Sequence, residues 1–142
     1  MKILVLNGPN LNLLGLREPD VYGAITLDEI NLSLQALAKA LGVQVDFFQS
    51  NHEGSIIDYL QDLQTDALII NAGAYTHTSI AIRDALVMLS IPKVEVHLSD
   101  VDNREDFRKI NYIRDVVDYH VVGKKEQSYI EAIRFLLKNI EI

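Results

Sequence analysis

The chain has 142 residues, 49% of them hydrophobic, and a formal net charge of -7. These values predict a single domain over residues 1–142 that can bury a sizeable core. The negative charge disfavours nucleic acids and anionic membrane surfaces as partners. The chain contains no cysteine, which excludes disulfides, thiol nucleophiles and thiolate metal ligands.

Neither a membrane helix nor a signal peptide is predicted. No apolar run reaches the ~18 residues that a membrane-spanning helix needs. The first residues, Met-Lys-Ile-Leu-Val-Leu, lack the length and the small-residue cleavage site of a signal peptide. We therefore expect a cytoplasmic protein.

Apolar runs that predict strands alternate with helical patterns along the chain. Residues 2–6 and 67–70 are continuous apolar runs, typical of strands buried on both faces. Further strands are predicted at residues 43–49, 93–98 and 119–122. Apolar residues recur at helical spacing in the remaining segments, at about residues 26–41, 54–63, 78–90 and 126–139.

Several helix ends carry recognisable signals. Thr26-Leu-Asp-Glu29 is a capping box, in which the hydroxyl and the carboxylate satisfy backbone N–H groups reciprocally. Gly42 follows the first long helix as its C′ residue. Thr78 or Ser79 is expected to cap the third helical segment, and Pro92 prevents that helix from continuing.

The alternation predicts an α/β fold with a parallel sheet covered by helices on both faces. Five strands in this length fit a flavodoxin-like three-layer sandwich with the order 2-1-3-4-5. Such sheets bind ligands outside the carboxyl ends of the strands, near the point where the strand order reverses. The loops after the first, third and fourth strands meet there, and their candidate side chains are Asn10, Asn12, Arg17, Tyr22, Asn71, Tyr75, His77, His97, Ser99, Arg104 and Arg108.

The loop at residues 7–23 is longer than the about 2–6 residues that usually connect a strand to a helix. A hairpin turn at Asn7-Gly8 is disfavoured, since Pro9 cannot donate to a following ladder. The leucines of this loop argue against disorder. We therefore interpret it as a structured functional loop, with Arg17 and Tyr22 as its working side chains.

An arginine beside a tyrosine can produce a base. A free phenol has a pKa near 10, too high for a good base at neutral pH. An adjacent guanidinium contributes about 4 kcal/mol at an effective dielectric of about 20, which lowers the phenol pKa by roughly three units. The alternatives are a solvated Arg17 with a packing Tyr22, and Glu18 as a rival base.

Two histidines are candidates for acid–base or binding roles. His97 lies at a strand end, where it suits a general acid, although a half-buried structural histidine fits equally well. His77 precedes a helix start and either holds a substrate oxygen or serves as a cap. His52 looks like part of a turn and His120 like a structural residue. The spacing of these residues matches no metal-site motif, so we expect no metal.

The segment after the fourth strand offers groups for an anionic ligand. Ser99 follows the strand end, and Arg108 can hold an oxygen-rich ligand. In a helix, Arg108 would share a face with Arg104. The alternative is that both arginines are exposed surface charges. Arg83-Asp84, by itself, is interpreted as a surface pair.

Four blocks of the sequence resemble type II 3-dehydroquinate dehydratase, in the order expected for that family. They are residues 7–19 with Tyr22-Gly23, 49–54, 71–79 and 94–99. The resemblance covers nearly the whole chain and implies a flavodoxin-like lyase. The implied reaction is the reversible dehydration of 3-dehydroquinate to 3-dehydroshikimate through an enolate, in the shikimate route to aromatic amino acids or in quinate breakdown.

The resemblance also implies residue roles. Tyr22 would be the proton acceptor, Arg17 the neighbour that keeps it ionised, and His97 the proton donor. Asn10 would position water or ring oxygens near the enolate. The implied substrate-binding residues are Asn71, His77, Asp84, Leu98, Ser99 and Arg108, with Asp84 reaching a neighbouring subunit's site. The family uses no metal or cofactor, and its members assemble as dodecamers, each a tetramer of trimers.

Two departures from the family pattern bear on the affinity for the substrate. Asp100 stands where we expect Asn and brings a carboxylate beside Ser99, and residues 111–116 differ from the usual Ser-Tyr-containing stretch. Two other functions compete with this assignment. One is a flavodoxin-like nucleotide or phospho-signalling module, although no phosphate-cradling Thr/Ser-Gly run follows the first strand. The other is a non-catalytic assembly protein, against which the intact Arg17, Tyr22 and His97 argue.

Overall fold

The computed structural model describes residues 1–22 and 24–139, apart from the side chain of Tyr22. Its sheet consists of β1 (Lys2–Asn7), β2 (Gln44–Gln49), β3 (Ala67–Asn71), β4 (Lys93–His97) and β5 (Tyr119–Val122). The paired strands are parallel and lie in the order β2-β1-β3-β4-β5. This confirms the flavodoxin-like order predicted from the sequence.

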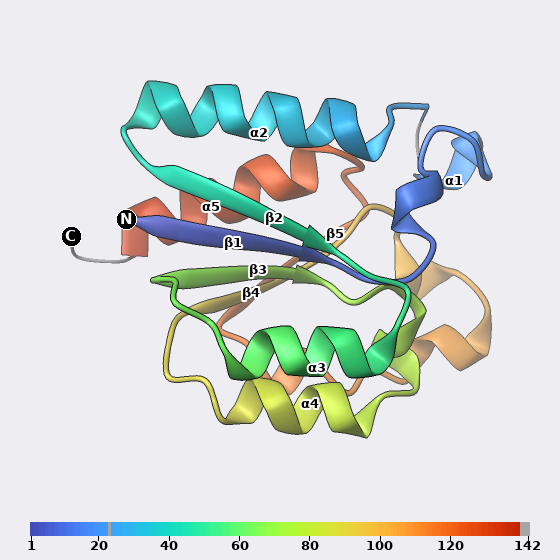
Figure 1. Ribbon diagram of the computed structural model, residues 1–142. Coiled ribbons are helices and arrows are strands. Elements are labelled where there is room, and N and C mark those ends of the chain that lie inside the picture. The colour runs from blue at the N-terminus through green and yellow to red at the C-terminus, as the bar shows by residue number, and fades with distance from the viewer. Residues whose placement is uncertain (23, 140–142) are drawn as a thin grey trace.

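Helices cover both faces of this sheet. They are α1 (Pro19–Tyr22), α2 (Leu27–Leu41), α3 (Glu53–Gln61), α4 (Ile80–Val87) and α5 (Gln127–Asn139). Figure 1 shows α2 and α5 on one face and α3 and α4 on the other. Short 3₁₀ turns lie in the loops: η1 (Leu11–Leu13), η2 (Gly73–His77), η3 (Val101–Asn103), η4 (Asp106–Lys109) and η5 (Arg114–Val116).

The core has two halves, one on each face of the sheet. Side chains alternate along a strand, so Ile3 and Val5 of β1 pack in the half formed with α2 and α5. Leu4 and Leu6 pack in the half formed with α3 and α4. All four residues are at most 2% exposed. The continuous apolar run at the start of the chain therefore reflects a strand with helices on both sides.

The predicted helix caps are confirmed in detail. Glu29 N donates to Thr26 Oγ1 at 3.2 Å, and Thr26 N donates to Glu29 Oε1 at 3.4 Å, which completes the capping box of α2. Gly42 has the left-handed conformation expected of a C′ residue, with φ of 73°. At the start of α4, Ser79 Oγ accepts from Ile82 N at 2.9 Å, so Ser79 rather than Thr78 is the cap.

Helix α4 ends at Val87, which corrects the predicted end near Ser90. The buried Lys93 explains the early end, because its Nζ donates to Leu86 O at 2.9 Å and to Leu89 O at 2.7 Å. The carbonyls at this helix end are thus satisfied by a side chain of β4 instead of by another helical turn.

The segment after β4 does not form one continuous helix. It forms the separate turns η3 and η4, and Arg104 between them has extended backbone angles. The predicted shared helical face of Arg104 and Arg108 is therefore wrong. The prediction of an Arg83-Asp84 pair is also wrong, because Arg83 forms a bidentate ion pair with Asp115.

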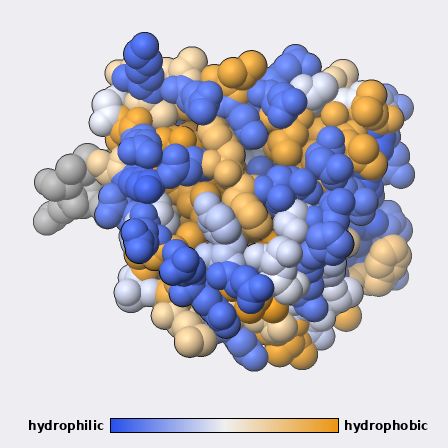
Figure 2. Space-filling model, in the orientation of Figure 1, coloured by the Kyte–Doolittle hydropathy of each residue, from blue (hydrophilic) through white to orange (hydrophobic). Residues whose placement is uncertain are grey.

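The outer surface carries both hydrophilic and hydrophobic residues. Figure 2 shows a largely hydrophilic face on which hydrophobic residues lie in separate groups. Along residues 1–22 and 24–139, none of the helices combines the length and the apolar character needed to cross a bilayer.

Candidate active site

The loops after β1 and β3 pass very close to each other at the carboxyl end of the sheet. Gly8 N donates to Asn71 O at 2.8 Å. A Cβ atom at position 8 would lie 2.5 Å from the carbonyl oxygen of Ala72. Gly73 has φ of 59°, and a Cβ atom there would lie 3.2 Å from the carbonyl oxygen of Pro9. Glycine at positions 8 and 73 therefore allows the two loops to meet and to form one wall of a cavity.

This cavity has a volume of about 150 Å³ and lies at the carboxyl ends of β1, β3 and β4. Its lining residues include three arginines and two histidines, and the described residues that line it include no carboxylate. Its lining is therefore cationic although the chain carries a net charge of -7. Such an arrangement suits a small anionic ligand.

Most of the predicted site residues lie around this cavity. The residues that line it are Pro9, Asn10, Leu11, Arg17, Asn71, Gly73, Ala74, His77, His97, Leu98, Ser99, Val101, Arg104 and Arg108. Asp84 does not line it and is exposed on α4. Gly23 and the side chain of Tyr22 lie outside the described part of the structure.

His97 is buried and is held by a neighbouring carboxylate. Its Nε2 lies 2.8 Å from Glu95 Oε2, and both residues are at most 3% exposed. Burial by itself would raise the pKa of Glu95. Hydrogen bonding and positive charge from His97, together with hydrogen bonds from Asn111 and Arg114, outweigh burial and lower that pKa to about 2. Glu95 is thus a carboxylate at neutral pH and can stabilise a positive charge on the His97 ring.

The sequence analysis missed Glu95, Asn111 and Arg114. A usable signal was present in β4, which reads Lys-Val-Glu-Val-His. Every second residue of this strand is polar, yet all five are buried. Buried charges are rare unless they are paired, so the pattern indicates that Lys93, Glu95 and His97 have partners on one face of the sheet.

His77 is held in a defined orientation near His97. Its Nδ1 lies 2.6 Å from the carbonyl oxygen of Ile110, to which it must donate. Burial is the main cause that lowers the pKa of His77, and the charges of His97 and Arg108 act in the same direction. His77 is therefore neutral at pH 7, with Nε2 as its hydrogen-bond acceptor. The His77 and His97 rings are stacked, with centroids 6.4 Å apart.

The arginines of the cavity are tied to neighbouring groups. Arg104 Nη1 donates to Ser99 Oγ at 3.2 Å, and Arg108 Nε donates to Glu105 Oε2 at 2.7 Å. Arg104 Nη2 also lies 3.9 Å from Glu18 Oε2 of the loop at residues 7–23. These contacts connect that loop to the segment after β4 and orient two guanidinium groups at the cavity.

Asn71 joins the cavity to the buried core. Its Nδ2 donates to Tyr129 Oη at 3.1 Å, and its Oδ1 accepts from Gly73 N at 3.1 Å. Tyr129 in turn donates to Asn7 Oδ1. Burial raises the pKa of Tyr129, so its phenol stays neutral. Because an amide nitrogen carries two N–H groups, Asn71 keeps one to offer a ligand.

Asp100, the departure noted beside Ser99, lies outside the lining of the cavity. Its side chain is exposed and accepts a hydrogen bond from Asn103 Nδ2. The structure therefore gives the Asp100 carboxylate no place in the lining beside Ser99.

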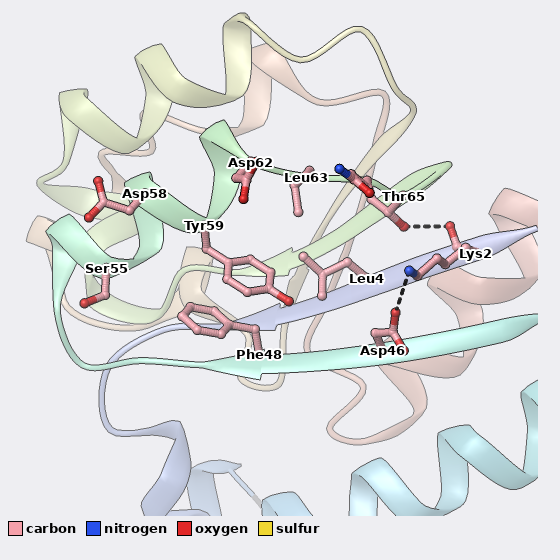
Figure 3. Close-up of a pocket in the computed structure, with 11 residues that line it drawn as sticks. Lys2, Leu4, Asp46, Phe48, Ser55, Asp58, Tyr59, Asp62, Leu63 and Thr65 are labelled. Carbon is pink, nitrogen blue, oxygen red and sulfur yellow. Dashed lines mark hydrogen bonds and ion pairs between the residues drawn. The ribbon is translucent and has the colours of Figure 1, made fainter.

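A larger cavity of about 660 Å³ lies between α3 and the β1–β2 edge of the sheet. Figure 3 shows Tyr59 stacked on Phe48, and Lys2 paired with Asp46. The described residues that line it include neither histidine nor arginine. It also lies away from the strand ends that hold the acid–base groups, and we do not assign it a catalytic role.

Over the described ranges, no three His, Cys, Asp or Glu residues are grouped so that they could hold a metal ion. The cavity beside His97 is smaller than the about 300–1,000 Å³ typical of sites for larger ligands. It therefore suits a small acid better than a flavin nucleotide.

The fold and this cavity define an α/β protein with a cationic cavity at the carboxyl ends of parallel strands and a carboxylate-held histidine beside it. A family model described as "Dehydroquinase class II" matches residues 1–137. The chain belongs to the class II dehydroquinase family.

Individual relatives agree with this assignment. A 3-dehydroquinate dehydratase from Geotalea daltonii is 48% identical over 99% of both chains. A catabolic 3-dehydroquinase 2 from Neosartorya fischeri is 49% identical over 97% of this chain and 93% of its own. The crystal structure of a type II dehydroquinase from Butyrivibrio crossotus has a TM-score of 0.94 and 47% identity, covering 96% of this chain and 97% of the other.

Proposed function

We propose that this protein is a lyase that dehydrates 3-dehydroquinate to 3-dehydroshikimate reversibly through an enolate. One observation carries the proposal. The cavity at the carboxyl ends of β1, β3 and β4 brings Arg17, His77 and His97 together in a cationic setting. Membership of the class II dehydroquinase family supports it independently. Relatives named for biosynthetic and for catabolic enzymes are about equally similar, so the direction of the pathway stays open.

The substrate is a small polyhydroxy keto acid, and the cavity offers matching groups. A guanidinium binds a carboxylate through two parallel N–H donors, and Arg104 and Arg108 line the cavity beside Ser99. Asn71 and the Nε2 acceptor of neutral His77 supply positions for hydroxyl groups. The described residues that line the cavity include no lysine, which speaks against an imine mechanism.

The proposed reaction has two proton transfers. Tyr22, as a phenolate, removes the proton alpha to the ketone, and the electron pair moves onto the carbonyl oxygen as an enolate. The enolate then expels the β-hydroxyl, which takes a proton from His97 and leaves as water. Arg17 keeps the phenol ionised, and Asn10 orients water or oxygens near the enolate. Donors aimed at such an oxyanion are typically worth about 2.7–4 kcal/mol of barrier each.

The proposal includes assembly of several copies into a dodecamer, a tetramer of trimers. Ile80 and Val87 of α4, the helix that also carries Asp84, are more than half exposed, as is Met88 directly after it. An exposed apolar group of this kind favours burial against another subunit. Asp84 would then reach the cavity of a neighbouring copy. The cytoplasmic location expected from the sequence also stays a prediction.

Mixing the protein with 3-dehydroquinate and following the ultraviolet absorbance of the conjugated enone product tests the activity. Tyr22→Phe and His97→Ala are each expected to abolish turnover. Tyr59→Phe and His120→Ala are matched controls, because both residues lie outside this cavity, and both variants should turn over normally. Near-normal turnover by the Tyr22 or the His97 variant would refute the assigned roles, and an inactive wild-type enzyme would refute the reaction.

A further inference from the structure

A network of buried and partly buried side chains extends from His97 to residues that do not line the cavity. Glu95 Oε2, which pairs with His97 Nε2 at 2.8 Å, also accepts from Asn111 Nδ2 at 2.7 Å. Glu95 Oε1 accepts from Arg114 Nε at 3.0 Å. The two oxygens of this carboxylate therefore receive three hydrogen bonds, of which only one comes from the catalytic histidine.

Asn111 organises the segment from which Arg114 extends. Its Oδ1 accepts from Ile113 N at 2.8 Å and from Arg114 N at 2.9 Å. One amide side chain thus donates to Glu95 and also fixes the turn that precedes η5. On its other side, Arg114 Nη1 lies 3.3 Å from both carboxylate oxygens of Asp102 in η3. The guanidinium is held between an exposed and a buried carboxylate.

The burial of Glu95 makes these donors necessary. A carboxylate that is 1% exposed loses nearly all its hydration, and it stays charged only if hydrogen bonds and nearby positive charges replace the water. His97 can supply one such hydrogen bond, and its charge changes during a proton transfer. Asn111 and Arg114 supply donors that do not change during the reaction.

We propose that Arg114 and Asn111 are positioning residues for the reaction, holding the Glu95 carboxylate against His97 Nε2 so that Nδ1 of the ring stays directed to the substrate. This inference rests on the proposed function. It concerns the segment 111–116, which departs from the usual family pattern. The ring acts as an acid only in one orientation, and a carboxylate on one nitrogen fixes both that orientation and the position of the proton.

The alternative is that Arg114 only anchors its own segment, and the structure offers a way to separate the two roles. The same segment is also anchored from outside by the ion pair between Arg83 and the exposed Asp115. Neither of these residues contacts Glu95 in the interactions described for it. Breaking this outer pair loosens the segment without removing a donor from Glu95.

Steady-state kinetics of four variants test the proposal. Arg114→Met is expected to lower kcat by at least about ten-fold, the low end of the 10–100-fold lost when partners that orient metal-bound histidines are mutated, with KM changed less than two-fold. Asn111→Asp keeps the acceptor of the turn but loses the donor, and a similar fall in kcat is expected. Arg114→Lys should restore part of the rate, and Asp115→Asn should stay within two-fold of wild type.

Crystal structures of wild type and Arg114→Met provide a readout that does not need activity. We expect Glu95 to move out of hydrogen-bond distance of His97 Nε2 in the variant. A variant that keeps both this contact and a kcat within two-fold of wild type would overturn the proposal, as would an equal loss of rate in Asp115→Asn. If wild type fails to dehydrate 3-dehydroquinate, the proposed function falls, while the structures still decide whether Arg114 holds Glu95.

Discussion

Glu95 and His97 lie two residues apart on β4 and extend from the same face of the sheet, with Oε2 and Nε2 2.8 Å apart. The proposed acid and the group that orients it are therefore carried by one rigid strand. The opposite, apolar positions of the strand, Val94 and Val96, pack in the core half with α2 and α5. A site built on a strand holds its geometry more closely than one built on loops, which suits a proton donor.

Replacement of Glu95 by glutamine should reduce catalysis more than binding. The amide keeps the shape of the side chain but loses the charge that stabilises a protonated His97 ring. We expect kcat to fall by about 10²-fold or more, within the 10²–10⁴-fold that general acid catalysis contributes, and KM to change little. Initial rates over a range of substrate concentrations give both constants, and an unchanged kcat would remove Glu95 from the mechanism.

The same carboxylate should make stability depend on pH in the acid range. The pKa of Glu95 is lowered to about 2 from 4.5, so its contribution is fully present above pH 4.5 and is lost as the pH falls toward 2. A shift of this size corresponds to roughly 3 kcal/mol. In urea unfolding at matched protein concentration, wild type should lose more stability than Glu95→Gln between pH 4.5 and 2. Equal losses would contradict the prediction.

Much of the fold was predictable because its signals are local. The apolar run at residues 2–6, the capping box at Thr26 and Gly42 after α2 each depend on a few neighbouring residues, and all three are confirmed. The region of the site followed from topology, since polar loops after β1, β3 and β4 must meet at one edge of the sheet. Residue chemistry left alternatives open for Arg17, Tyr22 and His97, and the family resemblance decided among them.

The network behind His97 was not predictable in the same way. Asn111 and Arg114 contact Glu95 across 16 and 19 residues, through a segment whose path depends on three successive 3₁₀ turns. Neither hydrophobic periodicity nor a motif specifies such a path. The same reason explains the wrong partner predicted for Arg83, whose contact with Asp115 spans 32 residues.

The capping box of α2 should contribute measurably to stability. Thr26→Ala removes the acceptor of Glu29 N and the hydroxyl of Thr26 that contacts the carboxylate. Loss of a cap of this type typically costs about 0.5–2 kcal/mol. Urea unfolding should give a loss in this range, while Thr26→Ser, which keeps the hydroxyl, should stay near wild type. A Thr26→Ala protein with the same free energy of unfolding as wild type would contradict this role of the cap.

The close passage of the two loops at Gly8 should tolerate no side chain. A methyl group there would lie 2.5 Å from a backbone oxygen of Ala72, so one of the loops must move. We expect Gly8→Ala to destabilise the protein by about 1–3 kcal/mol, as overpacking usually does, and to lower turnover because both loops line the cavity. Gly54→Ala is the control, since no atom lies within 4 Å of a Cβ at that position. Equal behaviour of the two variants would contradict the role of Gly8.

Arg17 should affect turnover more than binding. It lines the cavity, and in the proposed mechanism its positive charge keeps Tyr22 ionised when substrate is bound. Arg17→Ala should therefore lower kcat strongly and change KM only slightly. A free phenol ionises near pH 10, so the variant should regain rate as the pH is raised toward about 10. Arg17→Lys keeps the charge and should retain more of the neutral-pH rate than Arg17→Ala. A kcat that is unchanged in Arg17→Ala, or a variant whose pH profile matches that of wild type, would mean that another group activates the base.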